Sequence, residues 1–270
     1  GIILPMLPHK NLIPDINLTP YSIWLATVVV SGISYLSYLL KRYVFHESGV
    51  LVSGIIGGLY SSTATISVLA RKSRKASEQE ANEYVAAMLL AVSMMFLRFM
   101  ILILIFSREI FTSIYPYLLI MSVVAAVVAW FIHSRHRRSK DMADESEDED
   151  SSNPLEFKVA LIFATLFVVF TVLTHYTLVY AGTGGLNLLS FVSGLSDITP
   201  FILNLLQNTG SVAVLVVVAC SMQAIISNIL VNMFYALFFA GKGSKLRPWI
   251  LGGFGTVIGV NLVLLLFFYL

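Results

Sequence analysis

Long apolar segments constrain the fold of this chain more than any other feature. Eight of them follow one another, at 21–40, 50–70, 84–106, 114–132, 157–180, 186–206, 212–240 and 246–270. A helix of about 20 apolar residues can cross the hydrocarbon core of a bilayer. Only 12% of the 270 residues are charged, against roughly 25% in a soluble domain. We therefore predict an all-α integral membrane protein, multi-pass in the cell membrane and in contact with the lipid bilayer.

Two polar stretches divide the chain. Residues 1–20 contain four prolines, which forbid a long helix. We expect this irregular lead-in to be the tail of a missing upstream helix, with a processed start as the alternative. A charged linker at 135–155 begins basic and turns acidic, which predicts a solvated cytoplasmic segment. A divalent-cation sensor is the alternative there, because carboxylates favour hard cations.

The linker separates a first membrane repeat, 21–134, from a second, 156–270. Residues 58–70 align without gaps on 194–206, with Gly, Leu, Thr, Ile and Leu matching in place. Both stretches are apolar segments interrupted by glycine and then by hydroxyl or acidic side chains. Such paired, interrupted segments are the best sequence indication of a transport site. We predict two repeats of about four segments each, with one interrupted or re-entrant segment in each repeat.

The basic residues favour inverted repeats. Lys and Arg in short loops mark the cytoplasmic side. If all eight segments crossed, the groups at 41–42 and 71–75 would lie on opposite sides, as would those at 135–140 and 242–247. If the second and sixth segments enter and return on the same side, all these groups lie inside. Eight full crossings with parallel repeats remain the alternative.

The first motif supplies small and hydroxyl-bearing residues. Glycine allows tight turns and close approach of the backbone, here at Gly57 and Gly58. Hydroxyls can supply oxygen ligands, and helix N-termini exposed by a break carry partial positive charge. We predict ion or substrate binding by a group of four hydroxyls, Ser61, Ser62, Thr63 and Thr65. The alternative is that these small residues only mediate helix packing.

The second motif supplies a carboxylate. Asp197 aligns with Ser61, follows Gly194 and precedes Thr199, and is the only acid between residue 157 and the C-terminus. An ionisable group at membrane depth is by default a functional hypothesis. We predict that Asp197 and Thr199 bind the ion and that Asp197 is the metal ligand. The alternative is that Asp197 caps the following helix near the surface.

Two further polar residues interrupt apolar segments. Arg98 lies within the third segment and needs a partner if it is buried; Asp197 is the natural candidate, and Arg98 would organise or gate the site. Snorkelling to the membrane surface is the alternative. Asn228 lies one helical turn from Asn232, and we predict that it lines the same cavity. Interhelical hydrogen bonding is the alternative for both asparagines.

The sequence carries no indication of covalent chemistry. It contains no zinc motif, phosphate loop, nucleophile elbow or dinucleotide fingerprint. Cys220, His175 and Asp197 do not suggest a nucleophile–base pair, so we predict that the protein is not an enzyme and uses no cofactor. The basic residues follow membrane topology rather than an aromatic-laced patch, which excludes a nucleic-acid partner.

The motifs resemble those of a known family. Gly-Gly-Leu-Tyr-Ser-Ser-Thr-Ala-Thr at 57–65, then Leu-Ala-Arg-Lys-Ser and Met-Phe-Leu-Arg98, is similar to a bacterial and archaeal membrane domain of unknown function, DUF4010. Gly194-Leu-Ser-Asp-Ile-Thr resembles its second signature. In that family the domain commonly follows an MgtC/SapB-like domain, whose relatives are linked to magnesium homeostasis. The resemblance implies an upstream MgtC/SapB-like domain in the same protein and suggests ion transport.

Together these observations predict a membrane transporter or channel-like protein that moves a small ion through a site built by two repeated hairpins. A divalent cation such as magnesium is the preferred ion, and we expect a homo-oligomer. The alternative is a non-transporting membrane subunit that senses ions or regulates a partner.

Overall fold

A computed structural model describes residues 3–44, 49–74, 76, 78–134, 157–207, 212–241 and 244–269. Within these ranges all regular structure is helical, without a named strand. The helices are η1 (Leu4–Met6), α1 (Pro20–Leu39), η2 (Leu40–Val44), α2 (Val50–Lys72), α3 (Glu78–Phe106), α4 (Arg108–Ser134), α5 (Phe157–Ser193), α6 (Ile198–Gln207), α7 (Val214–Ala240) and α8 (Arg247–Tyr269).

Seven of these helices have the length and apolar composition needed to cross a membrane, namely α1 to α5, α7 and α8. The prediction of an all-helical protein with several membrane spans is therefore confirmed. The linker predicted at 135–155 lies outside the described residues.

The first long helix starts where the prolines of the lead-in end. Thr19 and Ser22 form a reciprocal capping box, in which each side-chain oxygen accepts the other residue's backbone N–H, at 3.0 and 3.1 Å. Pro20 occupies the first helical turn, where a missing N–H has no consequence. The lead-in itself packs on the protein through Ile16 and Leu18, which are buried.

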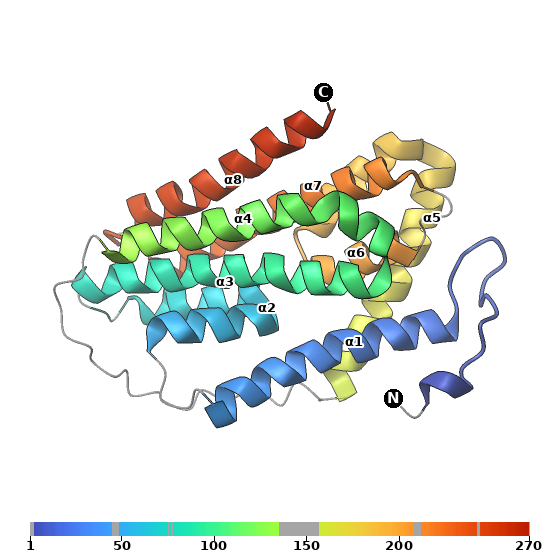
Figure 1. The fold of residues 1–270 in the computed structure, drawn as a ribbon, viewed down its shortest axis with the longest axis horizontal. Coiled ribbons are helices and arrows are strands. Elements are labelled where there is room, and N and C mark those ends of the chain that lie inside the picture. The colour runs from blue at the N-terminus through green and yellow to red at the C-terminus, as the bar shows by residue number, and fades with distance from the viewer. Residues whose placement is uncertain are drawn as a thin grey trace.

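Helices α3 and α4 form an antiparallel pair in the middle of the bundle (Figure 1). Only Ser107 separates them along the chain. The hydroxyl of Ser93 on α3 donates to the carbonyl oxygen of Ser122 on α4 at 2.9 Å, so a polar contact joins their buried faces. Phe96 and Phe99 on α3 are buried and make α3 the central helix of the core.

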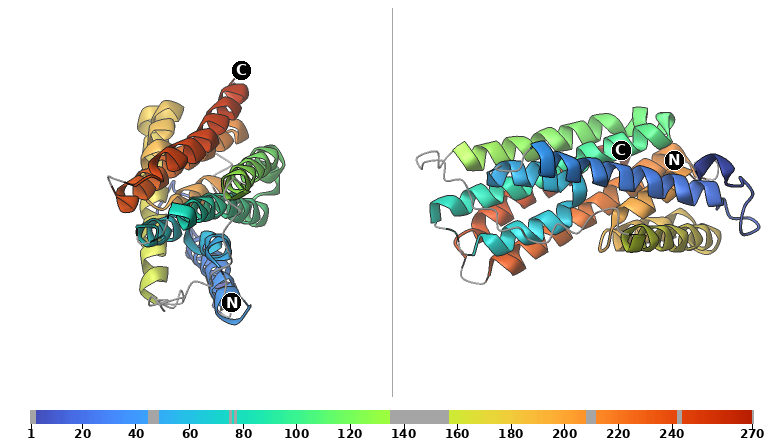
Figure 2. Two further views of the ribbon diagram at one scale, coloured as in Figure 1. Left: turned by 90° about the vertical axis from the view of Figure 1, so that its left-hand side faces the viewer. Right: turned by 90° about the horizontal axis from the view of Figure 1, so that it is seen from below.

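Helix α2 reverses direction at Ser61. That residue has extended backbone angles, φ −157° and ψ 107°, inside an otherwise helical segment. A Cβ added at Gly57 would clash with Thr65, although eight residues of continuous helix would separate the two by about 12 Å. The two halves of α2 therefore lie side by side (Figures 1 and 2).

Helix α5 differs from the expected boundaries. The sequence predicts one segment ending at 180 and another at 186–206, but α5 continues to Ser193 with a kink at Gly182. The glycine makes this possible, because its φ of 59° and ψ of −152° disfavour any residue with a Cβ. The predicted sixth segment is instead divided by residues 194–197, after which α6 begins. The first part of α5 runs across the α3–α4 pair rather than along it (Figures 1 and 2).

Helix α7 runs opposite to α3. Arg74, just after α2, donates from Nε to the carbonyl oxygen of Phe239 and from Nη2 to that of Phe238 at 3.1 Å. Both carbonyls belong to the last turn of α7, so α7 ends where α3 begins. The described parts of the basic groups at 71–75 and 242–247 thus lie at one end of the bundle, where Arg74 and Lys245 line one cavity. The group at 135–140 lies outside the described residues.

This arrangement predicts the sidedness of the chain. In a Cys220→Ala background, we expect Lys72→Cys and Ser244→Cys to react with a membrane-impermeant maleimide from the same side of the membrane. Thr112→Cys, at the opposite end of α3 and α4, should react from the other side. Labelling of positions 72 and 244 from opposite sides would contradict the common basic end.

Candidate functional site

Each of the two matching motifs contains a helix break. The first lies at Ser61 within α2, and the second at 194–197 between α5 and α6. At the second break, the N–H groups of Leu195 and Ser196 still bond back to the preceding turn, each at 3.1 Å. A helix end leaves backbone N–H and C=O groups without intrahelical partners. Backbone groups without a hydrogen-bond partner are costly in an apolar environment. We therefore describe the site by the side chains that form hydrogen bonds with the backbone at the two breaks.

A glycine before each break packs directly against the next long helix. A Cβ at Gly58 would lie 2.7 Å from the carbonyl oxygen of Ala91 on α3. A Cβ at Gly194 would lie 2.7 Å from the carbonyl oxygen of Ala224 on α7 and would clash with Ser227. Ala91 follows Gly58 by 33 residues, and Ser227 follows Gly194 by the same number. Only glycine fits at either position without moving the backbone.

The same spacing recurs one turn earlier. A Cβ at Gly54 would clash with the carbonyl of Ala87, and Ser190 donates to Oε1 of Gln223 at 2.9 Å, again 33 residues apart. A constant spacing means that the helix half entering each break runs parallel to the next long helix. The chain must therefore turn back between them, so each motif folds as a hairpin whose tip is the break.

Arg98 on α3 joins the two breaks. Its Nη1 donates to the carbonyl oxygen of Tyr60 at 2.8 Å, directly before the first break. Its Nη2 donates to Oγ1 of Thr199 at 2.6 Å, in the first turn after the second break. The guanidinium is partly buried and carries its charge at all physiological pH values. Residues from three segments far apart in the sequence thus meet at one side chain.

Asn228 on α7 donates hydrogen bonds to carbonyl oxygens before the second break, as Arg98 does before the first. Its Nδ2 lies 3.3 Å from the carbonyl oxygen of Gly194 and 3.4 Å from that of Ser196, and donates to them. Ser196 aligns with Tyr60, so each carbonyl that precedes a break accepts from a side chain on the next long helix. Asn232 supports this arrangement by donating to Oδ1 of Asn228 at 3.1 Å.

Asp197 caps α6. Its Oδ1 accepts the backbone N–H of Thr199 at 2.9 Å, which is the bond that an N-cap side chain makes. The residue is exposed, as is Leu195 beside it. The expected pairing with Arg98 is not direct. The described residues include no ion pair between them, because the guanidinium binds Tyr60 and Thr199, and Asp197 attracts it from further away.

The hydroxyls of the first motif take separate places. Ser61 Oγ accepts the N–H of Ala64 at 3.3 Å and thereby caps the second half of α2. Thr65 packs across the hairpin on Gly57, Ser62 is buried, and Thr63 is partly buried in the first turn after the break. Among the described residues, no hydrogen bond joins these four hydroxyls to Arg98. The structure thus gathers Arg98, Thr199 and the two tips, with the four hydroxyls on the first hairpin.

Asp197 is isolated as a carboxylate. Within the described ranges, no group of three His, Cys, Asp or Glu side chains is placed to hold a metal ion. A cation bound at Asp197 would take its other ligands from hydroxyls, main-chain carbonyls and water.

Sequence reasoning missed the main-chain partners. The carbonyls of Tyr60, Gly194 and Ser196 carry no signal in side-chain patterns, although a break in an apolar segment requires donors for them. It also missed Ser227, whose buried hydroxyl lies against Gly194 without a hydrogen-bond partner in the described part of the chain. Ser227 follows Gly194 by 33 residues, as Ala91 follows Gly58, and this repeated spacing could have indicated the contact.

Comparison with known proteins places the chain in a family. The profile described as Domain of unknown function (DUF4010) matches residues 28–240. The chain belongs to this family. The DUF4010 match extends from within α1 to the end of α7, and so includes both breaks, Arg98 and Asn228. An uncharacterized protein of Aquifex aeolicus (strain VF5) is 27% identical over 221 residues, which cover 81% of this chain and 94% of the relative. No solved structure matches.

The close approach at the first break predicts sensitivity to a single side chain. Gly58→Val would push α2 away from Ala91 and should lower the free energy of unfolding by about 1–3 kcal/mol. Gly255→Val is the matched control, because no atom of the described residues lies within 4 Å of a Cβ at this helical position. Thermal unfolding of both variants in detergent measures the difference. Equal losses in the two variants would exclude tight packing at Gly58.

Proposed function

We propose that this protein is a membrane transporter or channel-like protein that moves a small ion between the two helix breaks. One observation carries the proposal. The guanidinium of Arg98 donates to Tyr60 at one hairpin tip and to Thr199 at the other, so the two tips share one fixed charge. An ionisable group within a membrane-spanning helix is a functional candidate by default.

We propose further that the two halves are inverted repeats with re-entrant hairpins. The aligned motifs, the shared spacing of 33 residues and the opposite directions of α3 and α7 support this. With the basic end in the cytoplasm, the α2 hairpin enters from inside and the α5–α6 hairpin from outside. Their tips then meet within the membrane, where irregular backbone must line protein or a water-filled cavity.

For the ion, a divalent cation such as Mg²⁺ is our preferred candidate. Mg²⁺ keeps several of its waters and is commonly bound through only one or two carboxylates. Asp197 offers an exposed carboxylate at the second tip, and the serine and threonine hydroxyls of the first hairpin offer further oxygens. The charge of Arg98 opposes a cation, and the carboxylate of Asp197, which attracts the guanidinium, offsets part of that charge.

Arg98 would act as a gate in this scheme. While both of its hydrogen bonds persist, the tips are held together and the path between them stays closed. Release of Thr199 would free the second hairpin without exposing the carbonyl of Tyr60. This conformational change needs only the hydrogen bond between Arg98 and Thr199 to break. Arg98 can then donate to water, and Oγ1 of Thr199 can bind water or the ion.

The remaining parts of the proposal concern the context of the chain. We propose that it works as a multi-pass protein of the cell membrane, as a homo-oligomer, without catalytic chemistry. An MgtC/SapB-like domain upstream in the same protein would fit the magnesium hypothesis. The alternative is a membrane subunit that senses ions or regulates a partner and moves nothing.

Flux through liposomes tests this proposal. We expect the purified chain to mediate Mg²⁺ uptake and Asp197→Asn to reduce it at least about tenfold, since the variant removes the charge. Its thermal stability should change little, because asparagine caps a helix about as well as aspartate. Asp15→Asn, which removes an exposed acid of the lead-in before α1, is the control and should keep its flux.

Three results would count against it. A folded wild-type protein that moves neither Mg²⁺, Na⁺ nor Cl⁻ would favour the non-transporting alternative. Flux of Cl⁻ alone would show that the transported ion is not a cation, while transport between the two breaks would still be possible. Unchanged Mg²⁺ flux in Asp197→Asn would mean that Asp197 does not bind the ion and only caps α6.

A further inference from the structure

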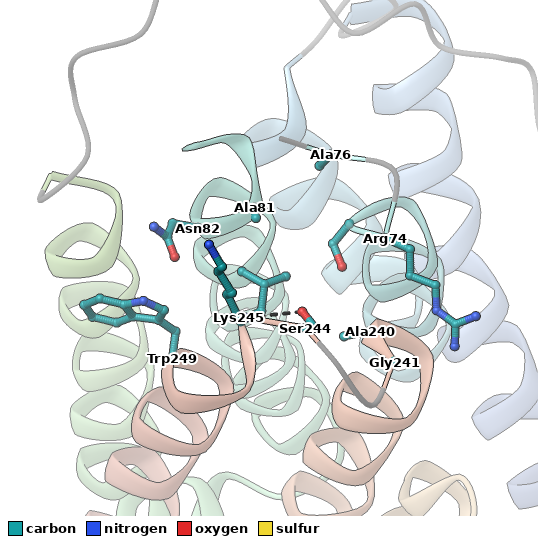
Figure 3. A pocket seen from close by; sticks show the side chains of 11 residues that line it. Arg74, Ala76, Ala81, Asn82, Ala240, Gly241, Ser244, Lys245 and Trp249 are labelled. Carbon is teal, nitrogen blue, oxygen red and sulfur yellow. Dashed lines mark hydrogen bonds between the residues drawn. The ribbon is translucent and has the colours of Figure 1, made fainter. Parts of the chain in front are cut away.

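A second candidate site lies at the basic end of the bundle, away from the breaks. A cavity of about 500 Å³ opens between the end of α2, the start of α3 and the connection from α7 to α8 (Figure 3). Small-molecule sites in proteins typically have volumes of about 300–1,000 Å³. Two stretches that are distant in the sequence, 73–82 and 240–249, build its wall, so the cavity is a product of the fold and not of one loop.

Its lining carries donors of both charged and neutral type. Lys245 on the α7–α8 connection and Asn82 at the start of α3 both line the cavity, and Ser244 precedes Lys245 in the chain (Figure 3). Arg74 lines the opposite side, where it holds the last carbonyls of α7. Among the residues that the structure describes, the lining of the cavity includes two cationic side chains and no carboxylate. Such a surface favours an anion.

Asn82 is the most specific part of this lining. It is only 5% exposed, yet its side-chain amide makes no hydrogen bond within the described ranges. The polar atoms of this side chain are not among the enclosed ones, so the amide faces the cavity and can form hydrogen bonds with a ligand there. The amide of Asn82 and the ammonium of Lys245 line the same cavity, so both can donate to an oxyanion bound in it.

The position of the cavity indicates where the anion comes from. It lies at the end of the bundle that carries the basic residues, which the positive-inside rule places at the cytoplasmic surface. Trp249 also lines it, and indole rings concentrate at the level of lipid headgroups. Basic pockets between membrane helices on the cytoplasmic side bind anionic headgroups.

We propose that this cavity binds a phosphoryl group, carried either by an anionic phospholipid or by a free phosphate compound. Lys245 supplies the charge, Asn82 and the neighbouring hydroxyls supply neutral hydrogen bonds, and Trp249 packs against the glycerol or organic part. This site is independent of the proposed ion pathway and does not depend on transport.

Ligand-induced stabilisation of the full purified chain in detergent tests the proposal. One arm compares dioctanoyl phosphatidylglycerol with dioctanoyl phosphatidylcholine, and the other compares inorganic phosphate with chloride at equal ionic strength. We expect a saturable rise of the melting temperature in at least one arm, because a ligand that binds only the folded state stabilises it. A response to phosphatidylglycerol alone identifies a lipid headgroup, and a response to phosphate alone identifies a free compound.

Two variants connect the response to this cavity. Lys245→Gln and Asn82→Leu should each raise the apparent dissociation constant about tenfold or more, as expected for a lost charge-assisted or buried hydrogen bond. Lys10→Gln removes an exposed charge from the lead-in and should bind like wild type. The proposal is overturned if neither ligand stabilises the protein beyond its matched control. It is also overturned if both variants keep wild-type affinity.

Discussion

One hydrogen-bonded guanidinium organises the middle of this protein. Breaking a helix inside an apolar segment leaves a carbonyl without an intrahelical donor, and lipid offers none. Arg98 supplies that donor to Tyr60 and, with its other nitrogen, holds the hydroxyl of Thr199 at the second break. Without it, the carbonyl of Tyr60 at the first break would lose this partly buried hydrogen bond, and no described hydrogen bond would link the two hairpin tips.

The rest of the architecture follows from keeping these breaks close to donors. Gly58 and Gly194 let the hairpins lie directly on α3 and α7, which brings Arg98 and Asn228 within reach of the carbonyls. The two long helices run in opposite directions, so the hairpins approach from opposite ends of the bundle. A site formed in this way has polar groups at its centre and apolar helices around it, which is the arrangement that we propose for ion movement. Asp197, exposed at the second tip, is the carboxylate available to an ion there.

The sequence was sufficient to predict an all-helical membrane protein and the approximate positions of its spans, because long apolar runs are compatible with few other folds. It located the two interrupted segments from glycine, hydroxyl and acid patterns, and singled out Arg98 as a charge in an apolar helix. It assigned Arg98 to Asp197, since charge complementarity is visible in a sequence and a main-chain carbonyl is not. The kink at Gly182 was missed because the glycines at 182, 184 and 185 are compatible both with a kink inside one helix and with a loop between two helices. The cavity around Asn82 and Lys245 could not be predicted from the sequence, because only the folded bundle brings residues 73–82 and 240–249 together.

The coupling between Arg98 and Thr199 tests the central claim most directly. A double-mutant cycle of Arg98→Leu and Thr199→Val, measured as free energy of unfolding in detergent micelles, isolates the contact between the hairpin tips. We predict a coupling energy of about 0.5–2 kcal/mol, the range found for interhelical hydrogen bonds in membrane proteins. Arg98→Leu combined with Thr27→Val, which removes a hydroxyl that donates to Ile23 within α1, should be additive. Additive effects of Arg98→Leu and Thr199→Val would contradict the account, because they would mean that the guanidinium does not join the two breaks.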